Sequence, residues 1–226
     1  GYCENDIVII TAYIDEQISQ YGSICKIPAT NTGRVREKMR DNCLMKSKGV
    51  PDRNQFNRYR GIMEQLTMTP EVYLQANQTF MGGFTHANAN HAGKTLHNVS
   101  SVDFTSSYPS VMLSEKFPMS RFKPIEINTA AELEKACSQY AVMMDITFHN
   151  IVASIPQECY LSASKCRDGK KVTENNGRVA LAEEITISIT EIDFDIIRKC
   201  YRWDSMEVSN AMYAHKNYLP KPIIET

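Results

Sequence analysis

Residues Ser101 to Leu113 read SVDFTSSYPSVML, and this stretch decides the fold expected around it. Its first residues predict a short apolar strand that ends at Asp103, and Tyr108-Pro109 predicts the start of a helix. Proline suits the first helical position, because its missing N–H would have no partner there in any case. The stretch therefore predicts a carboxylate beside a helix N-terminus.

This arrangement suits a nucleotide and its metal ion. The free N–H groups of a first helical turn bind phosphate, and Mg²⁺ prefers carboxylate oxygen while it keeps water or phosphate as its other ligands. Asp103 is thus a candidate Mg²⁺ ligand, and Tyr108 offers a flat ring beneath a nucleotide sugar. A purely structural alternative is a strand-to-helix turn with a capping serine and a buried tyrosine.

Three motifs occur in the order of a known family. Asp103 to Ser110 resembles motif A of family B DNA polymerases. Phe80-Met81-Gly82-Gly83-Phe84 resembles the Tyr-x-Gly-Gly linker between exonuclease and palm, and Tyr2-Cys3-Glu4-Asn5-Asp6 fits Tyr-x-x-x-Asp, the third exonuclease motif. The resemblance is closest to the bacteriophage and organellar branch, which includes protein-primed enzymes, and it extends over essentially the whole chain.

The resemblance implies catalytic and metal-binding roles for three residues. Asp103 would bind both Mg²⁺ ions of the polymerase site. Asp6 would bind a metal ion of a 3′–5′ exonuclease, with Tyr2 orienting the attacking water. Two such ions, about 4 Å apart, stabilise the attacking and leaving oxygens of phosphoryl transfer in the complete enzyme.

The same resemblance implies nucleotide contacts at the start of the motif A helix. Ser106 would lie near the triphosphate, and Tyr108 would stack under the sugar and exclude a 2′-hydroxyl. Ser107 stands where the family usually has Leu, which changes the packing beside the nucleotide.

Five residues are candidate DNA contacts. Gly82 and Gly83 permit close backbone approach to a phosphate, although a plain turn is the alternative. Phe80 replaces the family's usual Tyr and lacks its hydroxyl. Lys165 and Arg178 lie in stretches, Ser-Lys-Cys and Asn-Gly-Arg, that also match the family; ordinary surface cations are the alternative.

The expected fold class is α+β. By resemblance it is a partial polymerase palm, with a mixed, mainly antiparallel sheet and packed helices, preceded by helices from the end of an exonuclease domain. Residues 1–25 would end the exonuclease-like domain, 26–125 would form the linker and first part of the palm with motif A, and 126–226 would continue the palm into the insertion before the fingers.

Local patterns predict the individual elements. A capping box at Thr129 and Glu132 and a hairpin turn at Asn176-Gly177 are the strongest signals. Helices are expected over Asn5–Tyr21, Val35–Lys46, Asp52–Leu66, from Pro70 towards Gln75, to Ser138 after the capping box, and from the Thr190 cap to Cys200; strands are expected over Ala141–His149, Arg178–Ile189 and Tyr201–Tyr213.

Composition indicates a globular, soluble protein. Of the 226 residues, 42% are apolar and 23% are charged, and the net charge is −1, so a DNA-binding face has to be local, as in the basic run Arg34–Lys48. Seven cysteines without a Cys-x-x-Cys pair indicate reduced thiols, and the histidines between 86 and 97 lack partners at zinc spacing. No run has transmembrane length, so we expect no membrane and a cytoplasmic location, in the host if the protein is viral.

The family's motif C, Tyr-x-Asp-Thr-Asp, and its triphosphate-gripping Lys-x-x-x-Asn-Ser-x-Tyr-Gly helix have no counterpart in these residues. We therefore expect an inactive fragment of a DNA-directed DNA polymerase with 3′–5′ exonuclease. Its partners would be DNA primer-template, deoxynucleoside triphosphates, the remainder of the polymerase and, in the protein-primed branch, a terminal priming protein. One alternative is a non-catalytic DNA-binding or scaffold subunit of a split phage polymerase; another is an unrelated α+β binding protein with chance motifs.

Overall fold

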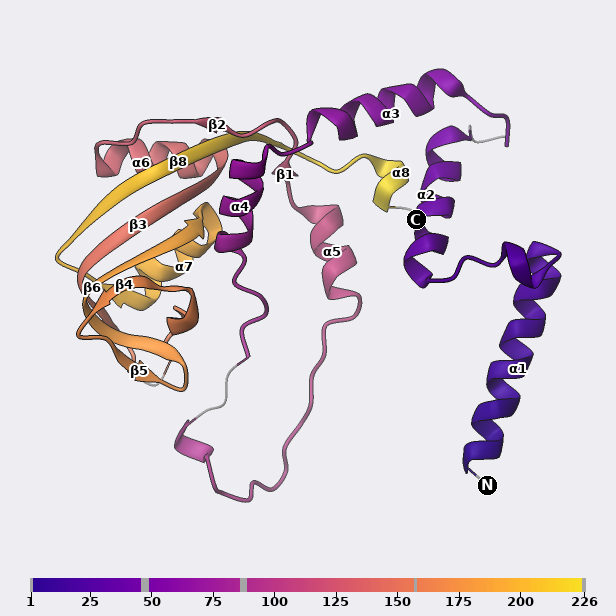
Figure 1. The fold of residues 1–226 in the computed structure, drawn as a ribbon. Coiled ribbons are helices and arrows are strands. Elements are labelled where there is room, and N and C mark those ends of the chain that lie inside the picture. Colours follow the sequence, from indigo (N-terminus) through magenta and orange to yellow (C-terminus); the bar gives the residue numbers. More distant parts are fainter. Residues whose placement is uncertain (1, 46–48, 86–88, 157, 225–226) are drawn as a thin grey trace. The chain divides into compact units, whose positions relative to one another are not determined.

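The structure, a computed structural model, describes residues 2–45, 49–85, 89–156 and 158–224 (Figure 1). The chain forms two compact units. The first contains residues 1–59 and 220–226, and the second contains residues 60–219. The expected regions 1–25, 26–125 and 126–226 stay predictions, since compactness does not test the boundaries of sequence regions.

The first unit is helical. Its elements are α1 (Tyr2–Tyr21), the 3₁₀ helix η1 (Ile24–Lys26), α2 (Asn31–Leu44), the start of α3 (Arg53–Gln65) and α8 (Lys221–Ile224). Thr30 caps α2 by accepting a hydrogen bond from the Gly33 N–H at 3.1 Å, which explains why this helix begins before the expected Val35. The predicted helices over Asn5–Tyr21 and Asp52–Leu66 are confirmed within a few residues.

The second unit is built on an antiparallel sheet. Strand β3 (Tyr140–Ala153) lies between β8 (Ser205–Asn217) and β6 (Arg178–Thr190), and every pairing between described strands is antiparallel. The short strands are β1 (Phe117–Pro118) and β2 (Lys123–Pro124) on β8, β4 (Arg167–Lys170) and β5 (Thr173–Asn175) on β6, and β7 (Tyr201–Arg202) on β3. This sheet and its helices confirm the expected α+β class.

One face of the sheet carries the hydrophobic core. Alternate residues of a strand point to one side, and Met144, Ile146 and Phe148 of β3 are fully buried there. They pack with Ile185, Ile187 and Ile189 of β6, which confirms the predicted alternation. Helices α6 (Ala130–Gln139) and α7 (Glu191–Cys200) cover this face with Leu133, Ala136, Phe194 and Ile197.

The opposite face of the sheet contacts α4 (Pro70–Thr79), which lies beside the strands in Figure 1. This helix continues past the predicted end near Gln75. Its buried residues Val72, Gln75 and Thr79 follow helical spacing, so one more turn buries Thr79 against the sheet.

Several local signals from the sequence are confirmed. The predicted capping box forms at Thr129 with Glu132, and the predicted cap at Thr190 forms as part of a second capping box, with Asp193. Asn176 and Gly177 have φ values of 52° and 71°, as a two-residue hairpin turn between β5 and β6 requires.

The strand expected over Tyr201–Tyr213 is wrong as one element. The chain leaves the sheet at Trp203 and Asp204 before β8 begins. Asp204 explains the break, because its N–H donates to the His149 carbonyl at 3.0 Å and its carboxylate accepts from the Asn150 amide at 2.8 Å.

Candidate functional site

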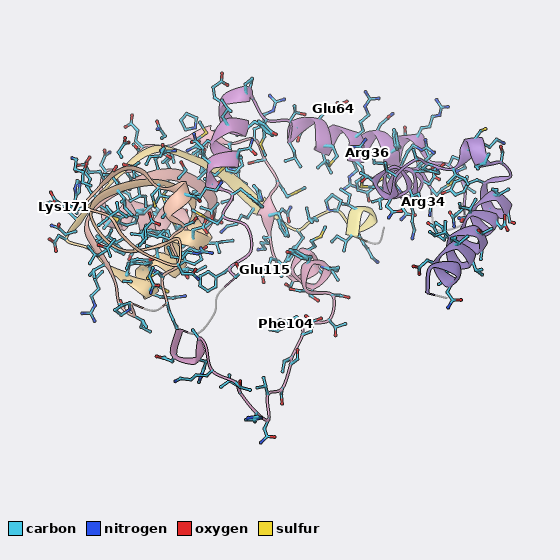
Figure 2. The ribbon with its side chains drawn as sticks, turned by 60° about the horizontal axis from the view of Figure 1, so that its bottom comes forward. Arg34, Arg36, Glu64, Phe104, Glu115 and Lys171 are labelled. Carbon is cyan, nitrogen blue, oxygen red and sulfur yellow. The ribbon has the colours of Figure 1, made fainter. Side chains whose placement is uncertain are left out.

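The motif A residues lie in an exposed segment of the second unit. Residues 101–104 form no strand and pair with no other strand among the described residues, so the expected strand ending at Asp103 is wrong. Val102 and Phe104 are 90% and 83% exposed, and Asp103 between them is exposed too. Figure 2 shows Phe104 on the extended segment that leads towards the helix ending near Glu115.

The helix after this segment, α5 (Ser107–Ser114), begins directly behind the candidate Mg²⁺ ligand. Its N-cap Ser106 is in the left-handed conformation, with φ 52° and ψ 46°, and makes no side-chain capping hydrogen bond. Pro109 is the third helical residue, not the first, but its missing N–H still falls among the first-turn groups that have no partner within a helix.

Ser106, Ser107 and Tyr108 are all exposed at this helix N-terminus, and Tyr108 is 84% exposed. A capping serine with a buried tyrosine is therefore not what the structure contains. The free N–H groups and hydroxyls here have the chemistry to bind phosphate, and the exposed tyrosine ring is accessible to a sugar.

The glycine pair follows α4. Phe80 is 69% exposed, whereas Met81 packs against the hydrophobic core. Gly82 has φ +70°, so the chain turns in a conformation that favours glycine, while Gly83 has an ordinary φ. The next residue, Phe84, lies with its ring 6.0 Å from that of Tyr160 and 4.9 Å from the Arg178 guanidinium carbon.

Arg178 joins this loop to a third stretch of the predicted site. Its Nη1 donates to the Tyr160 carbonyl at 2.7 Å, and its backbone pairs with Ser162. Ser162 precedes the 3₁₀ helix η3 (Ala163–Lys165), so the half-buried Lys165 belongs to the same region. We call Phe84, Tyr160, Lys165 and Arg178 the Arg178 cluster.

Hydrogen bonds support this cluster from the core side. The Tyr160 hydroxyl donates to Asp193 Oδ1 at 2.6 Å. Burial, and then this hydrogen bond, raise the pKa of Tyr160 well above its usual range, so the ring keeps its proton and its donor role. The sequence singled out Lys165 and Arg178 but missed Tyr160 and Phe84, because their contacts join stretches far apart in the chain.

The two predicted metal ligands belong to different compact units, Asp6 to the first and Asp103 to the second. Asp6 is exposed near the start of α1, and the side chain of Tyr2 lies outside the described residues. Across the described part of the chain, no group of three His, Cys, Asp or Glu side chains is placed to hold a metal ion. Asp103 fits Mg²⁺ as a single oxygen ligand, and the described residues do not complete its site.

No helix among the described residues is both long enough and apolar enough to span a membrane. No curated protein matches the chain. A solved structure described as "Phi29 DNA Polymerase, orthorhombic crystal form" is similar with a TM-score of 0.43 and 14% identity. The match covers 67% of this chain and 25% of that one.

The family comparison covers far more of the chain. The model of the family "DNA polymerase type B, organellar and viral" matches residues 1–225, which include all three sequence motifs. The chain therefore belongs to the organellar and viral family of type B DNA polymerases.

Proposed function

We propose that this chain supplies the motif A part of a DNA-directed DNA polymerase, with Asp103 as one of the carboxylates that bind Mg²⁺. The observation that carries the proposal is the exposed group of Asp103, Ser106 and Tyr108 at the N-terminus of α5, in a chain of this family. The substrates would be a DNA primer-template and deoxynucleoside triphosphates. When bound, Mg²⁺ supplies neutralisation of the triphosphate charge.

The chain's own residues would hold and orient the nucleotide. The N–H groups of Ser107 and Tyr108 and the Ser106 hydroxyl can donate to phosphate oxygens, and the helix dipole favours negative charge there. The Tyr108 ring would lie under the sugar and exclude a 2′-hydroxyl by contact.

Exposed apolar side chains support the proposal that this segment works with the remainder of a polymerase. Val99, Val102, Phe104 and Leu113 are between 61% and 90% exposed, and α5 contains no buried residue. Several large exposed apolar side chains in one segment favour a surface that another part covers. We infer that the chain does not extend DNA alone, because the metal site needs carboxylates from that other part.

The Arg178 cluster is the proposed contact with DNA. Arg178 and Lys165 offer cations for phosphates, and Gly82-Gly83 allows close approach of a backbone. In a protein-primed enzyme the terminal priming protein would be a further partner. By the same family relation, Asp6 and Tyr2 would contribute to 3′–5′ exonuclease activity.

Primer extension tests the proposal. We would compare the complete polymerase that contains this chain with its Asp103→Asn variant, on labelled hairpin DNA with Mg²⁺ and deoxynucleotides. Asp168→Asn is the matched control, since Asp168 is an exposed carboxylate in β4. Asp103→Asn should lower the extension rate roughly 100-fold or more, as for loss of a group that stabilises transition-state charge, and the control should not. Undiminished extension by Asp103→Asn would refute the assignment.

The second candidate function is a non-catalytic DNA-binding or scaffold subunit of a split polymerase. It is favoured by the lack of a three-residue metal-ligand group in the described part of the chain. Under this proposal the polymerase would bind the hairpin DNA with unchanged affinity after Asp103→Asn, and its extension rate would not depend on that residue.

A further inference from the structure

A polar network lies on the sheet face opposite the hydrophobic core. Its centre is Asp145 of β3, whose side chain is 11% exposed. The carboxylate accepts from Ser188 Oγ on β6 at 2.5 Å, from Arg167 Nη2 on β4 at 3.1 Å and from Asn210 Nδ2 on β8 at 2.9 Å. Arg167 Nη1 also donates to Ser188 Oγ at 3.0 Å, so four strands meet at one carboxylate.

Helix α4 is attached to this network by Gln75, and Gln78 lies beside it. Gln75, which is 8% exposed, donates from Nε2 to the Asn210 carbonyl at 2.6 Å. The Gln78 amide oxygen lies 3.4 Å from Ser188 Oγ. The network therefore joins the helix to the two strands that flank β3.

The Asn210 carbonyl is available to Gln75 because β8 is irregular there. The register between β3 and β8 shifts between Met143 and Asp145, and Asn210 has φ 49°. A bulge leaves one residue outside the ladder pairing. Its amide then binds Asp145 and its carbonyl binds the helix.

Polar contacts fix a helix on a sheet more specifically than apolar packing, because each donor needs one acceptor at one distance. Only the short stretch Phe80–Gly83 separates the end of α4 at Thr79 from Phe84. At the other end of that stretch, Phe84 contacts Arg178 and Tyr160. The glycine loop is thus held by the network on one side and by the Arg178 cluster on the other.

We propose that the Asp145 network positions α4 and, through it, the Gly82-Gly83 loop against Arg178, so that Asp145 and Gln75 are positioning residues for the DNA contact. The inference rests on the proposed function for its DNA step alone. The placement of the loop can be measured without DNA.

Hydrogen–deuterium exchange of the chain tests the placement. Gln75→Met keeps the side-chain volume but removes the donor to Asn210, and Asp145→Asn removes the charge while keeping the shape. Asn77→Met is the matched control, because Asn77 is an exposed amide on the same helix. We expect Gln75→Met to raise amide exchange over residues 79–85 about tenfold, with α7 unchanged. The control should leave both segments unchanged.

The affinity of the chain for hairpin DNA, measured at several salt concentrations, tests whether the placement of the loop affects DNA binding. Gln75→Met should weaken binding about threefold with an unchanged salt slope, because Lys165 and Arg178 keep their charges. Arg178→Ala should instead reduce the slope. An unchanged melting temperature of Gln75→Met would show that the loss of affinity does not come from a general loss of fold. If Gln75→Met does not fold, Gln78→Met or Asp145→Asn would be measured in its place.

The outcomes separate the two proposals. Unchanged exchange over residues 79–85 in both Gln75→Met and Asp145→Asn would overturn the inference, whatever the DNA result. Raised exchange with unaltered DNA affinity would also overturn it, since the network would then not serve the contact. Raised exchange in the variants, together with a wild-type chain that binds no DNA, would support the positioning of the loop and refute the proposed DNA contact.

Discussion

Gly82 and Gly83 are neighbours, but only Gly82 has a backbone conformation that requires glycine. Gly82 has φ +70°, and a Cβ at Gly83 would meet no atom within 4 Å. The two positions therefore separate a conformational role from a role in close approach to a ligand.

We predict that Gly82→Ala lowers the free energy of unfolding by about 1–2 kcal/mol, the cost of a left-handed residue with a Cβ. Gly83→Ala should leave stability unchanged and weaken DNA binding, because the new methyl group would meet the phosphate backbone. Urea denaturation and fluorescence anisotropy with hairpin DNA measure the two effects. Equal stability of both variants would contradict the conformational assignment, and full DNA affinity of Gly83→Ala would contradict close approach.

Two thiols give the second unit a dependence on alkaline pH. Burial raises the pKa of Cys137 and of Cys166 from 9.0 to about 11. The folded state then keeps protons that the unfolded state releases, so stability is fully present below pH 9 and is lost as the pH rises towards 11.

We expect each thiol to contribute up to about 2 kcal/mol to this loss. Chemical denaturation at pH 8.5 and pH 10.5, values chosen on either side of the thiol's ordinary range, would measure it. Cys166→Ala should flatten the pH dependence, and Cys25→Ala, at an exposed position, is the control. An equally steep decline in Cys166→Ala would contradict the role of that thiol.

Among the elements, α6 and α7 begin with the same capping box in two different environments. In α6, Glu132 is exposed. In α7, Asp193 is 8% exposed and also accepts from Tyr160, which belongs to the Arg178 cluster. The buried box should therefore contribute more to stability.

We predict that Thr190→Ala costs about 2 kcal/mol and that Thr129→Ala costs about 1 kcal/mol or less. Both changes remove the acceptor of a backbone N–H, which lies 3.2 Å away in α6 and 3.3 Å away in α7. The costs differ because Asp193 is buried, so water replaces the lost acceptor less well in α7 than at the exposed Glu132. Urea denaturation of the two variants measures it. Equal costs would show that burial of the box adds nothing.

Element boundaries that depend on residues adjacent in the sequence could be predicted from the sequence. The capping box at Thr129, the cap at Thr190, the Asn176-Gly177 turn and the alternating isoleucines of β6 were all expected and are present. The strand before Asp103 was not found, because a strand exists only through a partner, and residues 101–104 have none in the described structure. The break at Trp203 and Asp204 depends on contacts with β3, which no local pattern contains.

The candidate site was predictable to a similar degree. Its motif residues could be named from the resemblance, and Lys165 and Arg178 do share a region with the glycine loop. Tyr160 and the Asp145 network could not be named, since their roles depend on hydrogen bonds between residues up to 135 positions apart. That further carboxylates complete the metal site with Asp103 stays a prediction.

For the whole molecule, burial is unevenly distributed. The fully buried large side chains lie in the second unit, on the sheet and the helices that cover it and, for Leu161, in the segment before η3. Helix α5 has no buried residue, and in α1 Ile7 and Ile10 are 65% and 57% exposed. Short helices without packing are marginally stable in water.

We therefore predict that amides of β3, β6 and β8 exchange with deuterium at least roughly 100-fold more slowly than those of α1 and α5. Mass spectrometry of peptic peptides would measure this in the chain by itself. In the complete polymerase α5 should become protected if another part covers it. Equal protection of α5 and β3 in the isolated chain would show that exposure does not govern local opening here.

Trp203 is the chain's one tryptophan, and it packs against Phe148 at 5.0 Å and Phe194 at 6.3 Å between ring centroids. Its emission therefore reports on the sheet unit alone, whereas the far-ultraviolet dichroism of the chain also contains the signal of α1 and α2, which lie in the first unit. A melt followed by both signals would show directly whether the two units lose their structure together or one after the other.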